Sequence, residues 1–154
     1  MSNPNDMSAD ALATAVAQKM YEADEASRHL GMALKEVRPG YAVMTMRVDS
    51  YMLNGHKTCH GGYMFLLADS AFAFACNSYN QNTVAQAAQI NFLKPVALDS
   101  LLTATAKEVS RTGRTGLYDI DVTNEEGVLV ATFRGNSHTV KGQHLPDPTE
   151  NKEE

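Results

Sequence analysis

The fold is decided by Asn54-Gly-His-Lys-Thr-Cys-His-Gly-Gly-Tyr-Met-Phe-Leu-Leu-Ala-Asp-Ser-Ala-Phe-Ala-Phe-Ala-Cys-Asn77, where a polar, glycine-marked approach precedes a hydrophobic run. From Tyr63 to Cys76, the only polar side chains besides Tyr63 are Asp69 and Ser70. A helix here is apolar nearly all round, so we expect it to be buried. It is too short to span a bilayer.

Asp69 is the exception in this helix. An unpaired carboxylate in such surroundings costs roughly several kcal/mol, unless a partner or a hydrated cavity offsets that cost. We expect its apolar neighbours to raise its pKa. Asp69 therefore needs an explanation.

Length and composition narrow the class of protein. At 154 residues the chain fits one domain, which can bury a core without disulfides or a structural metal. The net charge of −5 and the pI near 5.5 argue against a nucleic-acid binder. Two cysteines are too few for a disulfide framework, and no basic start followed by an apolar stretch marks a signal peptide. We expect a cytoplasmic protein, with neither a membrane nor a nucleic acid as partner.

The chain divides into a short start, one domain and a tail. We expect residues 1–8 to be a flexible N-terminus, residues 9–141 to be a single domain, and residues 142–154 to be a disordered C-terminal tail. Residues 9–29 have helix-forming composition, with Ser8 as the cap.

Strand patterns occupy most of the remaining domain. Alternating polarity and turn signals predict about six strands: 32–37, 41–48, 83–93, a hairpin that turns at 111–114, and 128–140. Strands largely segregated from helices indicate an α+β fold. The apolar helix needs apolar surface on every side, which a curved antiparallel sheet wrapped around it supplies. One face of the helix could instead border a partner subunit.

Gly61 and Gly62 stand at the expected start of this helix. Their backbone N–H groups, unblocked by side chains and helped by the helix dipole, would suit an oxyanion. The alternative is that the glycines only let the loop turn sharply into the helix. Asp69 follows Gly61 by eight residues, or about 12 Å along a helix. Both can therefore serve one reacting atom only if Asp69 meets Gly61 of another subunit.

Several motifs together resemble the hotdog-fold acyl-CoA thioesterases, and among them the bacterial thioesterases of phenylacetic acid degradation. They are Leu53-Asn-Gly-His-Lys-Thr-Cys-His-Gly-Gly62, Leu67-Ala-Asp-Ser-Ala-Phe-Ala-Phe-Ala-Cys-Asn77, Ile90-Asn-Phe-Leu-Lys-Pro95, Leu101-Leu-Thr-Ala-Thr-Ala106, Thr115-Gly-Leu-Tyr-Asp-Ile120 and Phe133-Arg-Gly-Asn-Ser-His138. The resemblance covers roughly residues 15 to 140. It implies a hotdog fold, in which the sheet wraps around the central helix. It also implies that two chains pair as a homodimer with active sites at their interface, and that dimers associate into a homotetramer.

The resemblance also implies roles for individual residues. Asp69 matches the catalytic carboxylate, acting either as general base on water or as nucleophile on the thioester carbonyl. Gly61 matches the residue whose N–H polarises that carbonyl. His60 and Asn54 match motif side chains that shape the loop and help to bind the carbonyl or the water.

Further residues are candidates for substrate binding. Gly62 adds a second N–H, and Ser70 bonds either to Asp69, to a water or to its own backbone. The phosphates of CoA call for cations, for which we expect Arg111, Arg114 and Arg134, although the first two could simply solvate a turn.

One departure limits the transfer of roles from the family. Some relatives place a hydroxyl on the strand after the helix, where this chain has Ala85, Ala87 and Ala88, with Gln86 or Gln89 as possible substitutes.

No metal and no cofactor is expected, because CoA is part of the substrate and product. The segment from His56 to His60 lacks the usual spacing of zinc ligands. Cys59 lies beside His60 and could be a nucleophile, but adjacent residues of an extended loop point apart, which favours a structural thiol.

The function that we predict is hydrolysis of aryl-acyl-CoA, namely phenylacetyl-CoA or hydroxyphenylacetyl-CoA, to the free acid and CoA in aromatic catabolism. A hotdog dehydratase or hydratase is a second possibility, with His60 paired to an acid across the site. A third is a non-catalytic acyl-CoA-binding regulator, which would have little reason to bury Asp69.

Overall fold

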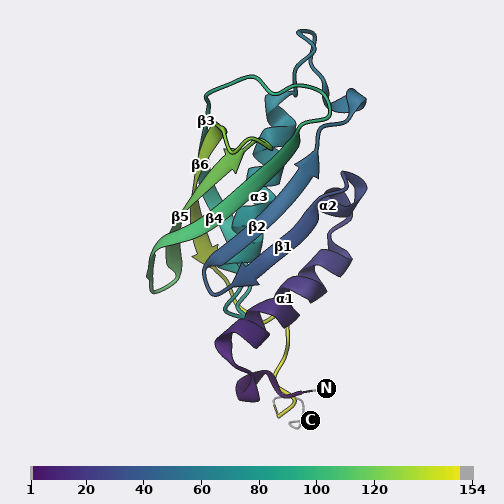
Figure 1. Ribbon diagram of the computed structural model, residues 1–154. Helices are drawn as coiled ribbons and strands as arrows, with labels where there is room; N and C mark the ends of the chain where they lie inside the picture. Colours follow the sequence, from purple (N-terminus) through teal and green to yellow (C-terminus); the bar gives the residue numbers. More distant parts are fainter. Residues whose placement is uncertain (1, 150–154) are drawn as a thin grey trace.

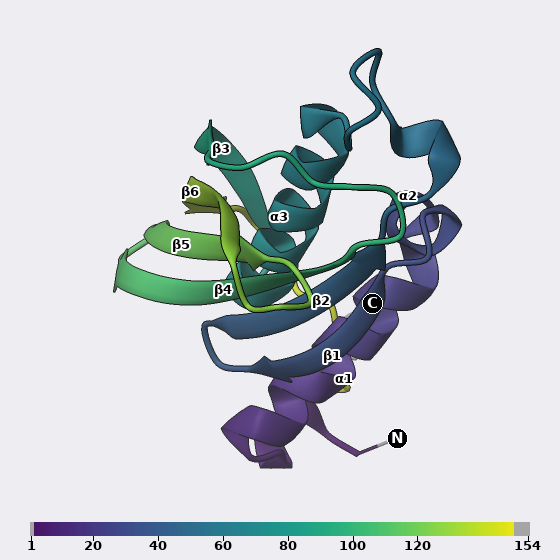
Figure 2. The same ribbon diagram turned by 45° about the horizontal axis from the view of Figure 1, so that its top comes forward.

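A computed structural model describes residues 2–149. Its elements, in chain order, are η1 (Pro4–Asp6), α1 (Ala9–Ala23), α2 (Glu25–His29), β1 (Ala33–Arg38), β2 (Tyr41–Arg47), η2 (Ser50–Met52), α3 (Gly61–Cys76), β3 (Thr83–Phe92), β4 (Leu101–Thr112), β5 (Thr115–Thr123) and β6 (Leu129–Thr139). The six strands form one antiparallel sheet in the order β1-β2-β4-β5-β6-β3. This sheet curves around α3 (Figures 1 and 2), so the predicted α+β architecture is confirmed.

The inner face of the sheet carries the apolar residues that alternation predicted. Side chains from β2, β4 and β5 turn toward α3, and all are at most 1% exposed: Ala42, Met44, Met46, Leu102, Ala104, Ala106, Tyr118, Ile120 and Val122. On the helix, Leu67, Ala68 and Ala71 are fully buried against them. This packing is the core of the domain.

One stripe of α3 is not covered by the rest of the chain. Its members lie on one face of the helix, at the i, i+3, i+4, i+7 spacing of an α-helical stripe, and are exposed or half-buried: Gly62, Phe65, Leu66, Asp69 and Ala73. The prediction of a helix buried on all sides is therefore correct except along this stripe, which includes Asp69.

The edge strand β3 is exposed on both faces. The side chains of Val84 and Phe92 are 50% and 54% exposed, although the first faces away from α3 and the second faces toward it. One side of β3 pairs with β6, and no strand in the described part of the chain pairs with its other side. An edge of this kind is available to another chain.

The N-terminal helix is broken where a single helix was predicted. Asp24 has non-helical backbone angles, ends α1 and caps α2, where its side chain accepts a hydrogen bond of 3.0 Å from the Ser27 backbone N–H. Aspartate is a favoured N-cap because its carboxylate satisfies such a donor. α1 packs along β1 (Figure 1), and its Tyr21 reaches Phe74 of α3, with ring centroids 6.4 Å apart.

The tail that we expected to be disordered has defined contacts over residues 142–149. The Leu145 backbone exchanges two hydrogen bonds with the Asn80 side chain, at 2.8 and 2.9 Å. His144 Nε2 lies 2.7 Å from Asn77 Oδ1, just beyond the end of α3. Residues 150–154 lie outside the described residues, and the predicted domain boundaries stay a prediction.

None of the helices within residues 2–149 has both the length and the apolar character needed to cross a membrane.

The close approach of sheet and helix makes Gly135 a sensitive position. A Cβ there would lie 2.7 Å from Phe72 Cε1, and that ring is held between Tyr118 and Phe133. We expect Gly135→Ala to lower the free energy of unfolding by about 1–3 kcal/mol, the usual cost of overpacking, as measured by urea denaturation. Gly55→Ala is the control, because nothing lies within 4 Å of its added Cβ. Equal stability of the two variants would contradict the tight fit.

Candidate active site at the N-terminus of α3

His60 caps α3 and decides which backbone donors stay free. Its Nδ1 accepts the Gly62 N–H at 2.9 Å, and its carbonyl accepts the Tyr63 N–H at 3.0 Å. Within residues 2–149, no group accepts the Gly61 N–H. Gly61 is therefore the free donor of the first turn, whereas the Gly62 donor that we had assigned to substrate is occupied.

The cap also fixes the tautomer of His60. Because Nδ1 is an acceptor, the proton of the neutral ring sits on Nε2. The side chain is exposed, so this Nε2–H is available to a ligand. His60 thus shapes the helix start and offers a donor beside Gly61.

Asn54 holds the loop that leads into the helix. Its Oδ1 accepts the backbone N–H groups of His56 at 2.9 Å and Thr58 at 3.3 Å, and its Nδ2 donates to Thr58 Oγ1 at 3.2 Å. The Cys59 N–H then donates to the Val96 carbonyl at 2.8 Å, which ties this loop to the segment after β3. These hydrogen bonds agree with the predicted role of Asn54 in shaping the loop.

A cavity of about 390 Å³ adjoins Gly61. It is lined by Asn54, Thr58, Cys59, Gly61, Met64, Phe92, Leu93, Lys94 and Pro95. The Phe92 ring lies so close to Gly61 that an added Cβ would meet its Cζ at 2.8 Å. Sequence reasoning did not assign Phe92 or Lys94 to the site, although both belong to the Phe-Leu-Lys-Pro motif that carried the resemblance.

Asp69 lies on the same helix but outside this cavity. No ion pair or hydrogen bond joins its side chain to any other residue that the structure describes. Burial raises the pKa of this carboxyl above its ordinary value, as predicted. Since α3 is continuous from Gly61 to Cys76, the two groups stay about 12 Å apart along the helix axis.

The thiols are unsuited to catalysis. Burial raises the pKa of Cys59 to about 11 and that of Cys76 to about 12, so both are protonated at neutral pH. Within residues 2–149, no three His, Cys, Asp or Glu side chains are grouped so that they could hold a metal ion.

The sequence matches the thioesterase superfamily over residues 56–131. It is 47% identical to the acyl-coenzyme A thioesterase PaaI of Escherichia coli over 126 residues, which are 82% of this chain and 90% of that relative. The chain belongs to the thioesterase superfamily.

Solved structures of this superfamily share the fold. The E. coli PaaI protein from the phenylacetic acid degradation operon matches with a TM-score of 0.87 at 45% identity, over 88% of this chain and 99% of that protein. A hypothetical thioesterase protein of Streptococcus pneumoniae, solved with coenzyme A, matches with a TM-score of 0.69 at 31% identity, over 73% of this chain and 90% of that protein. The predicted family and fold are confirmed.

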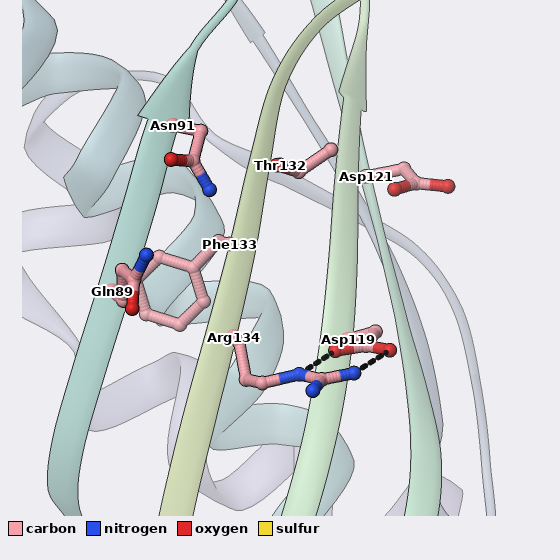
Figure 3. A pocket seen from close by; sticks show the side chains of 7 residues that line it. All are labelled: Gln89, Asn91, Asp119, Asp121, Thr132, Phe133 and Arg134. Atoms are coloured by element: carbon pink, nitrogen blue, oxygen red, sulfur yellow. Dashed lines mark hydrogen bonds and ion pairs between the residues drawn. The ribbon is translucent and has the colours of Figure 1, made fainter.

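The arginines that we expected to bind phosphate lie elsewhere on this thioesterase fold. Arg134 donates two hydrogen bonds, of 2.7 and 2.8 Å, to the Asp119 carboxylate on the outer face of the sheet (Figure 3). Arg111 stacks on the Tyr79 ring at 3.7 Å and reaches Gln81. Arg114 is in the β4–β5 turn, and its carbonyl bonds to Thr139, near the C-terminal end of α3. None of the three lines the cavity at Gly61.

Ser70 and Gln89 also differ from expectation. Ser27 Oγ lies 2.6 Å from Asp24 Oδ2 and 3.0 Å from Ser70 Oγ, so Ser70 joins α3 to α2 instead of bonding to Asp69 or to its own backbone. Gln89 pairs with Arg134 in the sheet register and shares its outward face (Figure 3). Gln89 therefore cannot replace the missing hydroxyl beside Asp69 of its own chain.

The cap predicts a contrast between two substitutions of His60. His60→Ala leaves the Gly62 N–H without its acceptor and should lower the free energy of unfolding by about 1 kcal/mol. His60→Ser restores an acceptor at the N-cap and should retain most of the stability. Urea denaturation of both variants measures the difference, and an equal loss in the two would show that the cap does not matter.

Proposed function

We propose that this protein is an acyl-CoA thioesterase that hydrolyses aryl-acyl-CoA, namely phenylacetyl-CoA or its ring-hydroxylated forms, to the free acid and CoA. The observation that carries the proposal is the unpartnered Asp69 carboxylate on the uncovered stripe of an otherwise apolar helix. The similarity to PaaI, an acyl-coenzyme A thioesterase of a phenylacetic acid degradation operon, supports the substrate class.

A thioester is an undemanding substrate for such a site. Its carbonyl is electrophilic and its thiolate leaves readily, so one oxyanion donor and one carboxylate suffice, with no cofactor. The Gly61 N–H, with His60 Nε2–H beside it, donates a hydrogen bond to the carbonyl oxygen and stabilises the negative charge that develops there. Asp69 either removes a proton from the attacking water or attacks the carbonyl itself, giving an anhydride that water hydrolyses. In both routes the C–S bond breaks and the CoA thiolate receives a proton.

The proposal requires a homodimer, because Asp69 and Gly61 of one chain lie too far apart for one carbonyl. The uncovered stripe of α3 and the free edge of β3 adjoin each other and suit a second copy. If two α3 helices pair antiparallel with Asp69 facing the partner's Gly61, residue 65 lies midway between them. Phe65 lies on the stripe and is 36% exposed, as a central interface residue should be. Pairing of dimers into a homotetramer belongs to the same proposal.

The competing functions fit these contacts less well. A dehydratase would need His60 as a general base, but because Nδ1 accepts the Gly62 N–H, the free Nε2 of the neutral ring carries the proton and has no lone pair to accept another. A binding protein without catalysis does not need a carboxylate whose charged form is disfavoured by burial. The cytoplasm suits two free, buried thiols.

Thiol release from phenylacetyl-CoA tests the role of Asp69. We expect Asp69→Asn to lower kcat/KM by at least about two orders of magnitude, because the amide keeps the shape and removes the base. Wild-type kcat/KM should rise with pH as Asp69 loses its proton, with an apparent pKa above the ordinary value of about 3.9.

The free energy of unfolding of Asp69→Asn is the control that its loss of turnover does not come from misfolding. Because burial raises the pKa of Asp69 in the folded state, the wild type loses stability as pH rises through that pKa. At pH 7, Asp69→Asn should therefore be at least as stable as the wild type. Equal turnover by wild type and variant would refute a catalytic Asp69, and thioester binding without turnover by either would favour the binding protein.

Mixed dimers test whether the site is shared between chains. Gly61→Pro removes the N–H at the first helical position, where the proline backbone is tolerated. Its ring meets the far end of the Phe92 side chain, which is 54% exposed and has room to move aside. Asp69→Asn and Gly61→Pro subunits are inactive alone, but a mixed dimer combines an intact Asp69 with an intact Gly61 at one of its two sites. Co-expression should restore about a quarter of wild-type activity if the subunits assort at random. No recovery in verified mixed dimers would place both groups in one chain's site.

A further inference from the structure

Charge is distributed unevenly along this acidic chain. Between Ser50 and Leu98, Asp69 is the only acidic residue, although the whole chain has 18. Two lysines, Lys57 and Lys94, lie in the same segment. The segment is therefore a locally cationic part of a protein whose net charge is −5.

The fold brings the two lysines to the same end of α3. Lys57 is in the loop that enters α3, and Lys94 follows β3. The bond from the Cys59 N–H to the Val96 carbonyl joins these two segments. Both lie beside the N-terminal end of α3 (Figures 1 and 2).

Of the described residues that line the cavity at Gly61, Lys94 alone is charged. Its side chain is exposed, and it forms no ion pair or side-chain hydrogen bond with residues 2–149. The other cavity walls near it, Phe92, Leu93 and Pro95, are apolar. The cavity thus combines apolar walls for a flexible arm with one unpaired cation at its rim.

The other candidate cations are less available. The Arg134 charge is neutralised by two hydrogen bonds to Asp119, and Arg111 is stacked on Tyr79. Arg114 is free of such contacts among the described residues, but it lies near the opposite end of α3.

We propose that Lys94 binds a phosphate group of the CoA moiety, whose pantetheine arm lies along the cavity between Phe92 and the Asn54–His60 loop. This inference rests on the proposed thioesterase function. Lysine binds phosphate as a compact point charge, and the pair is stronger where apolar walls exclude part of the water. Lys94 therefore contributes to substrate binding and not to the chemical step.

A pair of substrates isolates the phosphate contact. Phenylacetyl-CoA and the N-acetylcysteamine thioester of phenylacetate share the acyl group and the thioester, but only the first carries phosphates. We expect Lys94→Gln to raise KM for phenylacetyl-CoA by about three- to tenfold with kcat unchanged. KM for the truncated thioester should not change, and Lys94→Arg should restore KM for the CoA substrate. The effect on KM should shrink as salt concentration rises.

Two further variants make the test specific. Lys35→Gln removes the same charge from β1, at the opposite edge of the sheet from β3, and should leave KM for phenylacetyl-CoA unchanged. Arg114→Gln tests the alternative position for the phosphates.

The possible failures are distinguishable. Equal KM changes for both thioesters in Lys94→Gln, no change for either, or a rise in KM confined to Arg114→Gln would each overturn the role of Lys94 while leaving the thioesterase in place. A wild-type protein that hydrolyses no CoA thioester would overturn the proposed function, and this inference with it.

Discussion

The burial of α3 by the curved sheet is the constraint on which the rest of this structure depends. An apolar helix is stable in water only if apolar surface covers it, and the six strands, with Tyr21 of α1, cover most of α3 outside one stripe. That stripe includes the one carboxylate of the helix. The surface that the chain leaves open thus also carries the unpartnered Asp69 carboxylate, so the proposed dimer and the proposed chemistry involve the same stripe of α3.

The start of the same helix shows how few groups are needed to make a donor site. The His60 ring and carbonyl accept hydrogen bonds from two N–H groups of the first turn. The Gly61 N–H is left without an acceptor among the described residues. Phe92 lies against Gly61, so a side chain at position 61 would meet its ring. A glycine here therefore serves both the donor and the packing of the cavity wall, and the two explanations of the glycine pair are not exclusive.

Cationic side chains are numerous on the surface, but few are available to an anion. The Arg134 guanidinium donates two hydrogen bonds to the Asp119 carboxylate, so its charge is already paired. The same hydrogen bonds hold the Asp119 pKa below its ordinary value. Arg111 gains a cation–π contact with Tyr79. The position of a cation relative to acids and aromatic rings, rather than its presence in the chain, decides whether it can bind phosphate.

Local patterns in the sequence were enough to predict most of the secondary structure, the buried helix and the unusual carboxylate, because hydrophobic periodicity and capping involve residues close in the chain. They missed the break at Asp24 between α1 and α2. They also indicated Gly61, and the resemblance to the thioesterases added His60 and Asn54, whose contacts span only a few residues. Tertiary structure alone decided that β3 is an edge strand, that Arg134 faces Asp119, that Ser70 bonds to Ser27 and that Lys94 lines the same cavity as Gly61. These depend on strand order and register between distant segments, which local propensity does not encode.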